Sequence, residues 1–543
     1  MNAVQWSLIP ALLSTLPLFC SAATLDVAKE NLTCSDVTGT PYCSISAAIA
    51  AAVNGDDINV GPGTYNENLS ILKSISISGS DAETTIVDGG GLSRTIFIQG
   101  DVVISGVTVQ NGYTSTGLGG GIWINGGSLI LTDAIVINNQ ADGGGGIGTS
   151  APLTLLRSVV SDNTSTNSLG SASGGGVYIS FSAADTQIIA STISNNTSDY
   201  SAGGILNLGS STAIVNSTIS GNATDVFGGG LANGGGSSSN VTLSNVTVSG
   251  NTAVAGGGVV NTNGVVRLSN TIVAGNSDLG SAPDCGEQTI HSDGYNLIGS
   301  TVGCSFVPAT GDILDQGAAG LGPLTDNGGG SPTHALLPGS RAIESGNPAG
   351  CREENNLLLS TDQTGESRTV DGDVDGIPVC DIGAYGFRHG LVADTGGSPL
   401  ITSETMGMAT FNVVLVSPPA SDVTVPVASS DLSEGEVTSG SLTFTPANWD
   451  QPQQVVVTGV DDSQLDGDVG YTVSVGPTVS LDPDYDNISL PALSVTNTDD
   501  DTAPEADESG GGGAVDLLIL LGIGLLGLWF QFESKRSKSR QAV

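Results

Sequence analysis

Short runs of alternating apolar and polar residues occupy most of residues 40–320. Val241-x-Leu243 and Val246-x-Val248 are two such runs. Their spacing of two is that of a β-strand, whose successive side chains point to opposite faces of a sheet. No apolar stripe of helical length lies between the runs. The pattern therefore predicts a region built from many short strands.

These strands belong to a repeat. A four-residue phrase that ends in asparagine recurs in steps of 28, 24, 33, 26, 29 and 25 residues. Its asparagines are Asn111, Asn139, Asn163, Asn196, Asn222, Asn251 and Asn276. Between them recurs a phrase of two or three glycines and one apolar residue, as at 228–231. A propeller blade needs about 40 residues and four strands, whereas about 26 residues with two or three short strands fit one coil of a parallel β-helix.

The coil around Asn222 can be interpreted residue by residue. We expect Ile219 to point into the core, and Thr218 and Ser220 to face outward. Asn222 would stand at a corner, where its amide can pair with the asparagine of the next coil in a ladder. Residues 228–230 would form a bend, because glycine adopts positive φ where a β-carbon would clash.

The N-terminal part fits the same architecture. Residues 43–79 begin with a short helix that places Ile45, Ile49 and Val53 on one side, and short strands follow. A helix over the first coil would shield the open end of the solenoid core. This stretch resembles the start of bacterial pectin-lyase-like β-helix proteins, including those with a CSLREA-type opening.

The end of the repeat region resembles the choice-of-anchor Q family. The matching segments are 322–346, 362–368 and 380–386. Thr364 and Gly386 stand where the family pattern has arginine and glutamate. The resemblance implies an extracellular β-helix with a variable anchor behind it, and it does not imply an enzyme.

From Leu391 the chain changes to alternating strands with few glycines. The expected strands are 409–416, 423–429, 440–446, 453–460, 471–475 and 492–498. Six short strands in about 110 residues are typical of a β-sandwich. The segments 402–415, 442–462 and 495–501 resemble the Calx-β family, across nearly the whole of residues 391–500.

Acidic residues gather in the expected loops of this second domain. They are Glu404, Asp461, Asp462, Asp466, Asp468, Asp499, Asp500 and Asp501. In Calx-β domains such groups bind Ca²⁺ at one end of the sandwich, and the resemblance implies the same here. Ca²⁺ takes six to eight oxygen ligands, and clustered carboxylates repel each other without a cation. The alternative is an acidic rim in contact with solvent.

The bulk composition narrows the class of partner. The 543 residues include 13 Lys+Arg and 54 Asp+Glu, a net charge of −41. This charge excludes a nucleic-acid partner, because binding a phosphate backbone needs basic residues that displace counterions. It suits a soluble surface and carboxylates that hold Ca²⁺.

Both ends of the chain carry targeting signals. The apolar run 8–19 and the small residues Ser21-Ala22-Ala23 predict a signal peptide that is removed after Ala23. Near the other end, residues 514–532 are mostly apolar and long enough to cross a hydrocarbon core of about 30 Å as a helix. The basic residues that follow would hold its end in the cytoplasm.

The C-terminal tail resembles the GlyGly-CTERM sorting signal of Gram-negative bacteria. The resemblance rests on Gly510, Gly511, Gly512 and Gly513, the apolar helix after them and the basic end. It implies a transient inner-membrane anchor and processing near the glycines by a rhombosortase-like protease of the rhomboid family. Secretion machinery would then deliver the body to the cell surface or the medium. The alternative is a plain single-span anchor.

The cysteines indicate an oxidising compartment. Six remain after removal of the leader, and an even number in an exported chain favours disulfides. Zinc binding is the alternative, but no C-x-x-C is present and the three histidines are scattered. Pairing of neighbours is the simplest of the 15 connectivities, and it predicts the disulfides Cys34–Cys43, Cys285–Cys304 and Cys351–Cys380.

Catalysis is the alternative function, because polysaccharide lyases and hydrolases use the pectin-lyase-like fold. A lyase needs a basic residue beside acids, and a glycoside hydrolase needs two positioned carboxylates. Between residues 100 and 299 the basic side chains are Arg157, Arg267 and His291, and the acids are dispersed. We therefore expect no catalytic residues. Trp123 and Tyr178 could contact sugars, and packing explains each equally well.

The predicted chain is all-β: a right-handed parallel β-helix, then a β-sandwich, then one transmembrane helix. Its parts are a signal peptide (1–23), the β-helix with an N-terminal cap (24–321), a C-terminal cap region (322–390), the Calx-β-like sandwich (391–500), an acidic and glycine-rich linker (501–513) and the sorting tail (514–543). The predicted function is that of an exported, non-catalytic adhesive or structural protein that binds glycan or other cell-surface material.

Overall fold

The computed structural model describes residues 23–501, apart from Thr40, 167–172, Ala184, Ser210, 281–282, Pro338, Glu354, Asn356 and 369–376. Residues 1–22 of the expected signal peptide, the glycines of the expected sorting signal and the expected transmembrane tail lie outside the described residues. Within the described part, no helix is both long enough and apolar enough to span a bilayer.

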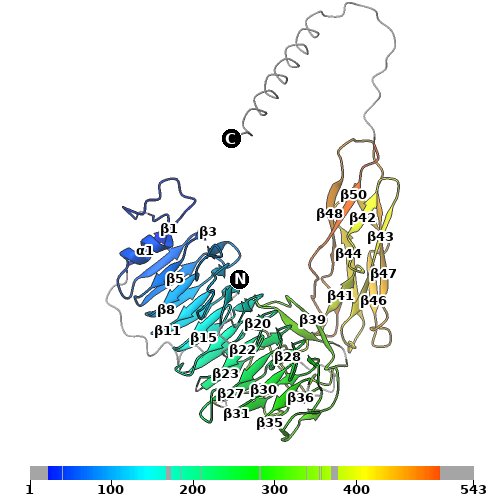
Figure 1. Cartoon of the computed structure of the whole chain (residues 1–543). Helices are drawn as coiled ribbons and strands as arrows, with labels where there is room; N and C mark the ends of the chain where they lie inside the picture. Colours follow the sequence, from blue (N-terminus) through cyan, green and yellow to red (C-terminus); the bar gives the residue numbers. More distant parts are fainter. Residues whose placement is uncertain are drawn as a thin grey trace, which may run out of the picture.

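The first part of the chain winds into a parallel β-helix, which runs from blue to green in Figure 1. Sheet A has twelve parallel strands: β1 (Thr24–Val27), β2 (Asp57–Val60), β5 (Ile75–Gly79), β8 (Asp101–Ser105), β11 (Ser128–Thr132), β15 (Leu153–Leu156), β19 (Thr186–Ile189), β23 (Ser211–Val215), β27 (Asn240–Ser244), β31 (Val265–Ser269), β35 (Ile290–Gly294) and β37 (Phe306–Val307). Sheet B has eleven: β3 (Gly63–Asn66), β6 (Thr85–Asp88), β9 (Thr108–Gln110), β12 (Ile135–Ile137), β16 (Val159–Ser161), β20 (Thr192–Ser194), β24 (Thr218–Ser220), β28 (Thr247–Ser249), β32 (Ile272–Val273), β36 (Leu297–Ile298) and β38 (Ile313–Leu314).

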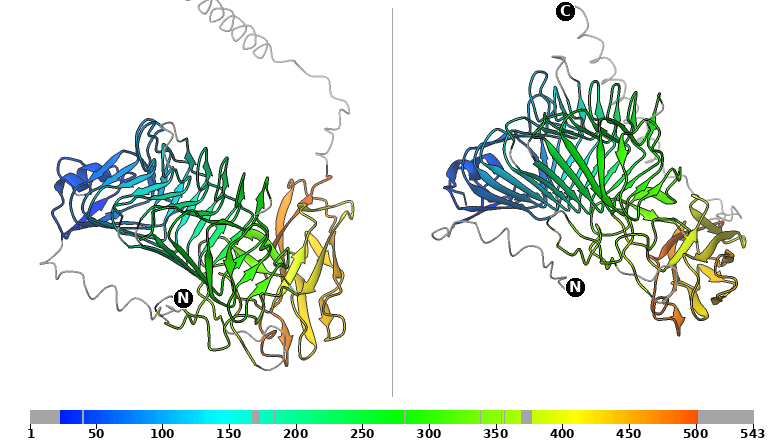
Figure 2. Two further views of the ribbon diagram at one scale, coloured as in Figure 1. Left: turned by 60° about the horizontal axis from the view of Figure 1, so that its bottom comes forward. Right: turned by 90° about the horizontal axis from the view of Figure 1, so that it is seen from below.

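Two further sheets complete the coils. Sheet C has nine strands: β4 (Leu69–Ile71), β7 (Ile96–Ile98), β10 (Ile122–Ile124), β14 (Ile147–Thr149), β18 (Val177–Ile179), β22 (Ile205–Asn207), β26 (Leu231–Asn233), β30 (Val259–Asn261) and β34 (Cys285–Glu287). Sheet D has six: β13 (Gln140–Ala141), β17 (Thr164–Ser165), β21 (Thr197–Ser198), β25 (Ala223–Thr224), β29 (Thr252–Ala253) and β33 (Ser277–Asp278). The middle coils visit the sheets in the order A, B, D, C, and Figure 2 shows their strands stacked along the solenoid.

A short helix covers the first coil. Helix α1 (Ile45–Ala51) contacts β1, β2 and β4, and Ser44 caps its start by accepting a hydrogen bond from the Ala47 N–H. Ile45 and Ile49 are buried as expected, but Val53 lies beyond the end of the helix and is 63% exposed. The expectation that Val53 faces the core is therefore wrong, because the chain leaves the helix at Ala52.

The expected asparagine ladder runs along the corner after sheet B. The Asn222 amide donates to Asn251 Oδ1 (2.9 Å) and to the Ile193 carbonyl (2.9 Å), and its own oxygen accepts from Asn196. The ladder joins Asn139, Asn163, Asn196, Asn222, Asn251 and Asn276, and ends on Asp284. Asn111 is an exception, because it lies one position earlier in its coil than the ladder asparagines do in theirs. It has φ 54°, and its amide donates to Asp88 Oδ2.

Replacing Asn222 by alanine is expected to lower the free energy of unfolding by about 2–3 kcal/mol, because it leaves buried backbone and amide groups of adjacent coils without hydrogen-bond partners. Chemical denaturation followed by far-UV circular dichroism measures the change. Asn263→Ala is the control, since Asn263 is exposed, and it should change stability by less than about 0.5 kcal/mol. Equal effects of the two substitutions would contradict a stabilising ladder.

The three disulfides form between the expected neighbours: Cys34–Cys43, Cys285–Cys304 and Cys351–Cys380. The last of them packs with Val215 on sheet A and with Leu359. It therefore attaches a segment from far along the sequence to the middle coils.

The described residues of the segment 319–388, here called the strap, lie along the outside of sheet B. The strap begins with a hairpin of β39 (Leu321–Thr325) and β40 (Thr333–Leu336). Ile272 and Leu297 of sheet B pack against its residues Ile382 and Phe387. The segment predicted to form a C-terminal cap thus covers a side of the solenoid.

The strap also meets the hydroxyl side chains of sheet B. Gln363 accepts from Thr218 Oγ1 (2.7 Å) and donates to Thr192 Oγ1 (2.8 Å). Ser220 Oγ lies 2.8 Å from His334 Nε2. Thr218 and Ser220 point away from the core as expected, since Ile219 between them is fully buried, but the strap buries both of them as well.

The described strap carries a histidine that is expected to make its attachment pH-dependent. Burial lowers the pKa of His334 below its ordinary 6.5, although the Gly322 carbonyl partly opposes this. The stability that a neutral histidine with a lowered pKa contributes is fully present above about pH 6.5. It is lost as the pH falls toward the pKa of the histidine in the folded state.

We therefore expect His334→Gln to remove part of the loss of stability between pH 6.5 and 5. Parallel denaturant titrations of wild type and variant at pH 7.5, 6.5, 5.5 and 5.0 measure this difference. His291→Gln, on sheet A outside the strap, should keep the wild-type slope. A His334→Gln slope equal to that of wild type would contradict the prediction.

The C-terminal domain is the expected β-sandwich, coloured yellow to orange in Figure 1. Its first sheet is β41 (Leu391–Asp394), β43 (Met408–Leu415), β47 (Gln453–Gly459) and β45 (Gly435–Val437). Its second is β42 (Leu400–Ser403), β50 (Leu493–Thr498), β48 (Val469–Val475), β44 (Val423–Ser429) and β46 (Ser441–Phe444), with β49 (Val479–Ser480) beside β44. Phe411, Phe444 and Tyr485 are buried in its core.

Candidate metal centre at one end of the sandwich

The strand register brings acidic residues together at one end of the sandwich. Strands β42 and β50 pair in parallel with Ser403 opposite Thr498, so the residues that follow them, Glu404 and Asp499, leave the sheet side by side. The connection from β47 to β48 returns to the same end. In the other sheet Gly435 pairs with Gly459, which places Glu434 opposite the start of that connection.

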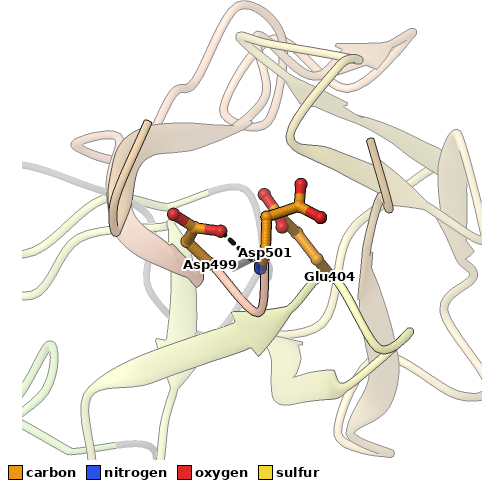
Figure 3. Close-up of side chains that lie close together, drawn as sticks. All are labelled: Glu404, Asp499 and Asp501. Carbon is orange, nitrogen blue, oxygen red and sulfur yellow. Dashed lines mark hydrogen bonds between the residues drawn. The ribbon is translucent and has the colours of Figure 1, made fainter. Parts of the chain in front are cut away.

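Glu404, Asp499 and Asp501 form the first carboxylate group, shown in Figure 3. Each offers an oxygen within 4.8 Å of the others. Backbone N–H groups hold the site: the Asp501 N–H donates to Asp499 Oδ1 (2.8 Å), and the Gly467 N–H donates to Asp499 Oδ2 (2.8 Å). The loops of β50 and of the β47–β48 connection are thereby tied together.

Glu434, Asp462 and Asp466 form the second group, again within 4.8 Å of one another. The Asn497 amide donates to Glu434 Oε2 (3.3 Å) and to the Val460 carbonyl (3.2 Å). Asn497 lies on β50, two residues before Asp499 of the first group. The two groups are therefore supported by the same strand.

The electrostatics of the first group favour a cation. Burial raises the pKa of Glu404, and the charges of Asp499, Asp462 and Asp501 raise it further, against a hydrogen bond from the Asp500 N–H. Burial likewise raises the pKa of Asp501, followed by the charges of Asp499 and Asp500. A divalent cation between these oxygens would replace their mutual repulsion by attraction.

One carboxylate oxygen of the first group fits a ligand that protein atoms do not supply. Asp501 Oδ2 is buried and has no hydrogen-bond partner among the described residues. A buried charged oxygen without a partner is costly. Oxygen-only donors from several loops are the set that Ca²⁺ prefers, so the residues present fit this ion.

The structure brings together five of the eight acids that the sequence suggested: Glu404, Asp462, Asp466, Asp499 and Asp501. Asp461, Asp468 and Asp500 lie in the same loops but outside both groups. Sequence reasoning missed Glu434, which is buried despite its charge. The available signal was the acidic pattern Asp431-x-x-Glu434-x-Glu436, which runs from a loop into β45 and is shared by many loops exposed to solvent.

Among the described residues, acid triads occur only in the sandwich. The described part of the solenoid therefore has no comparable group. Arg157 and Arg267, the candidate bases, form salt bridges with Asp133 (2.6 Å) and Asp293 (2.7 Å). Trp123 and Tyr178 lie on the outward positions of β10 and β18 and are half-buried.

No family model matches the sequence, and no curated protein matches it. Among solved structures, the apo form of the Calx CBD1 domain is 17% identical and covers 20% of this chain and 98% of its own, with a TM-score of 0.17. Pectin methylesterase PemA from Erwinia chrysanthemi is 12% identical and covers 47% of this chain and 79% of its own, with a TM-score of 0.28. A pectin methylesterase in complex with a hexasaccharide is 9% identical and covers 53% of this chain and 81% of its own, with a TM-score of 0.23. No conclusion about activity follows from likenesses of this size.

Proposed function

We propose that this chain is an exported, non-catalytic β-helix protein that presents a binding or structural surface outside the cell, and that its sandwich binds Ca²⁺. The observation that supports the absence of catalysis is the pairing of Arg157 and Arg267 with aspartates. A carboxylate beside a guanidinium favours its protonated form, which cannot accept a proton. The disulfides and the charge of −41 suit a location outside the cytoplasm.

Incubation with polysaccharides tests the absence of catalysis. Purified chain is mixed with pectins, alginates and neutral glycans, with and without Ca²⁺, and new unsaturated ends, reducing ends and released methanol are measured. We expect none of these products above the buffer background. Product formation that is lost in Arg157→Ala or Arg267→Ala would establish the alternative function, a polysaccharide lyase or hydrolase.

Adhesion is tested by binding of the labelled chain to whole bacterial cells and to isolated surface glycans. We expect saturable binding that unlabelled chain displaces. Binding to no cell or glycan preparation would refute the adhesive part of the proposal and favour a purely structural role.

Calcium binding is tested by isothermal titration of the metal-free chain. The geometry of the two carboxylate groups supports the expectation of saturable Ca²⁺ binding. In the double variant Glu404→Gln/Glu434→Gln we expect the heat to disappear. Equal heats for wild type and the double variant would refute the assignment.

Sorting at the C-terminus rests on the sequence of residues 510–543. We propose that a rhombosortase-like protease cuts near Gly510–513 while the apolar helix is in the inner membrane, and that the body then reaches the surface or the medium. Replacing the four glycines by leucines in a Gram-negative host that has such a protease should retain uncut chain in the membrane fraction. Unchanged release would favour the plain single-span anchor.

A further inference from the structure

The solenoid changes its cross-section at Tyr113. Sheet D begins with β13, and Tyr113, in the coil before β13, forms an isolated parallel bridge to Gln140 of that strand. The described coils before it have no strand in sheet D. The wall formed by sheet D therefore ends at a step next to Tyr113, here called the Tyr113 step. Tyr113 lines two open hollows at this step, of about 440 and 420 Å³.

The first hollow combines apolar surface with one cation. Leu92 is 88% exposed, Phe97 is half-buried, and the Arg94 guanidinium lies 5.9 Å from the Phe97 ring centroid. Backbone carbonyls fix the guanidinium: Nη2 donates to Leu118 (2.7 Å) and Nε to Gly119 (2.8 Å). Arg94 has no carboxylate partner in the described part of the chain.

The second hollow offers amide groups above a floor without side chains. Gly90 and Gly91 both have φ +70°, and an added Cβ would meet nothing within 4 Å. Asn138 and Gln140 line this hollow with Asn111. The side-chain amides of Asn138 and Gln140 and the Tyr113 hydroxyl have no hydrogen-bond partner among the described residues. A ligand can therefore bond to them by displacing only water, without breaking a hydrogen bond within the described part of the protein.

These features match a carbohydrate. A pyranose ring has an apolar face that can pack on an aromatic ring, and hydroxyls around its edge that both donate and accept hydrogen bonds. Unpaired amides recognise such hydroxyls, because each amide supplies a donor and an acceptor. Each hollow has the volume of an ordinary small-molecule site. The negative charge of the chain disfavours an anionic glycan at a distance.

We propose that the Tyr113 step binds a neutral oligosaccharide, whose rings pack on Tyr113 and whose hydroxyls bond to Asn138, Gln140 and Arg94. This inference rests on the proposed function as a surface-binding protein, and it names the ligand class and the place. The place lies outside the sandwich and outside the part of sheet B, from β20 to β36, that the strap contacts.

The test is binding of the full chain to hexasaccharides of glucose, mannose, xylose and galacturonate, measured by saturation-transfer NMR and titration calorimetry. We expect at least one neutral hexasaccharide to bind more tightly than the galacturonate. Tyr113→Ala should weaken binding at least tenfold, Gln140→Ala several-fold, and Tyr113→Phe less than threefold, because the ring remains. Tyr200→Ala is the matched control, since Tyr200 is exposed three coils further along.

Each failure has a distinct meaning. If no neutral hexasaccharide binds, or if galacturonate binds best, the ligand class is overturned. If Tyr113→Ala binds like wild type, the location is overturned. If Tyr113→Ala still binds whole cells, the proposed function stands, but the Tyr113 step is not the site that binds them. If the wild type binds neither cells nor sugars, the proposed adhesive function and the Tyr113 step are both refuted. A melting temperature of Tyr113→Ala equal to that of wild type shows that any loss concerns binding and not folding.

Discussion

Replacing Arg368 by methionine is expected to lower the free energy of unfolding by about 3–5 kcal/mol, the range observed when one partner of a buried charged network is removed. Arg368 belongs to the strap, and its side chain, 1% exposed, lies between the strap and the solenoid. Its guanidinium donates to Asn216 Oδ1 on the solenoid and to the carbonyls of Thr361 and Gly383. Methionine fills a similar volume but leaves these acceptors buried without donors.

The charges around Arg368 add to the expected loss. Burial raises the pKa of Asp381 to about 6, while hydrogen bonds from the Glu344 and Phe387 N–H groups and the charge of Arg368 act in the opposite direction. Without the guanidinium, the carboxylates of Asp381 and Asp362 would face each other with less compensation. Asp362 retains Arg388, whose Nη2 lies 2.9 Å away.

Denaturant unfolding followed by tryptophan fluorescence and limited proteolysis measures the effect of Arg368→Met. We expect a lower transition midpoint and faster cleavage within the strap. Arg341→Met is the matched control, because Arg341 is exposed and its side chain bonds, among the described residues, only to Gln316. An Arg368→Met midpoint as high as that of Arg341→Met would show that the network does not hold the strap.

Removal of Ca²⁺ is the second change with a large expected effect. A ligand that binds only the folded state stabilises it by about 2.7 kcal/mol at 100 times its Kd and about 4.1 kcal/mol at 1,000 times. We therefore expect chelation to lower the melting temperature of the sandwich by several degrees. The solenoid transition should not move, because the described solenoid has no acid triad.

Single variants assign the effect to the two carboxylate groups. Glu404→Gln and Glu434→Gln should each reduce the Ca²⁺-dependent rise in melting temperature. Both should melt close to wild type, or above it, in chelator, since each removes a buried charge that lacks its cation. Asp450→Asn, in the loop between β46 and β47 at the other end of the sandwich, is the control and should keep the full rise. Equal melting temperatures with Ca²⁺ and with chelator would contradict the calcium proposal.

Much of the fold could be predicted because its causes are local and repeated. The spacing of the asparagines and the glycine bends define one coil, and each coil places the same residue types at the same corner. Asn222 and Ile219 therefore have the expected positions. The disulfides were predictable because each joins cysteines at most 29 residues apart.

The path of the strap could not be predicted, because its contacts join residues far apart in sequence. Gln363 and Thr192 are separated by 171 positions, and Thr192, Thr218 and Ser220 have the composition of a surface exposed to water. Glu434 was missed for a similar reason, since only the pairing of β45 with β47 brings it to Asp462. The Tyr113 step was missed because it depends on where sheet D begins, and hydrophobic periodicity does not report this.

The strap also determines the order in which the molecule can assemble. Coils of a solenoid contact only their neighbours and can form one after another, whereas the strap can dock only when β20, β24 and β28 already stand side by side. Its closure is therefore a late step of folding, and one that connects coils which are not neighbours in the stack. Once closed, it prevents the middle coils from fraying separately, so a chain of loosely independent repeats becomes a single cooperative unit.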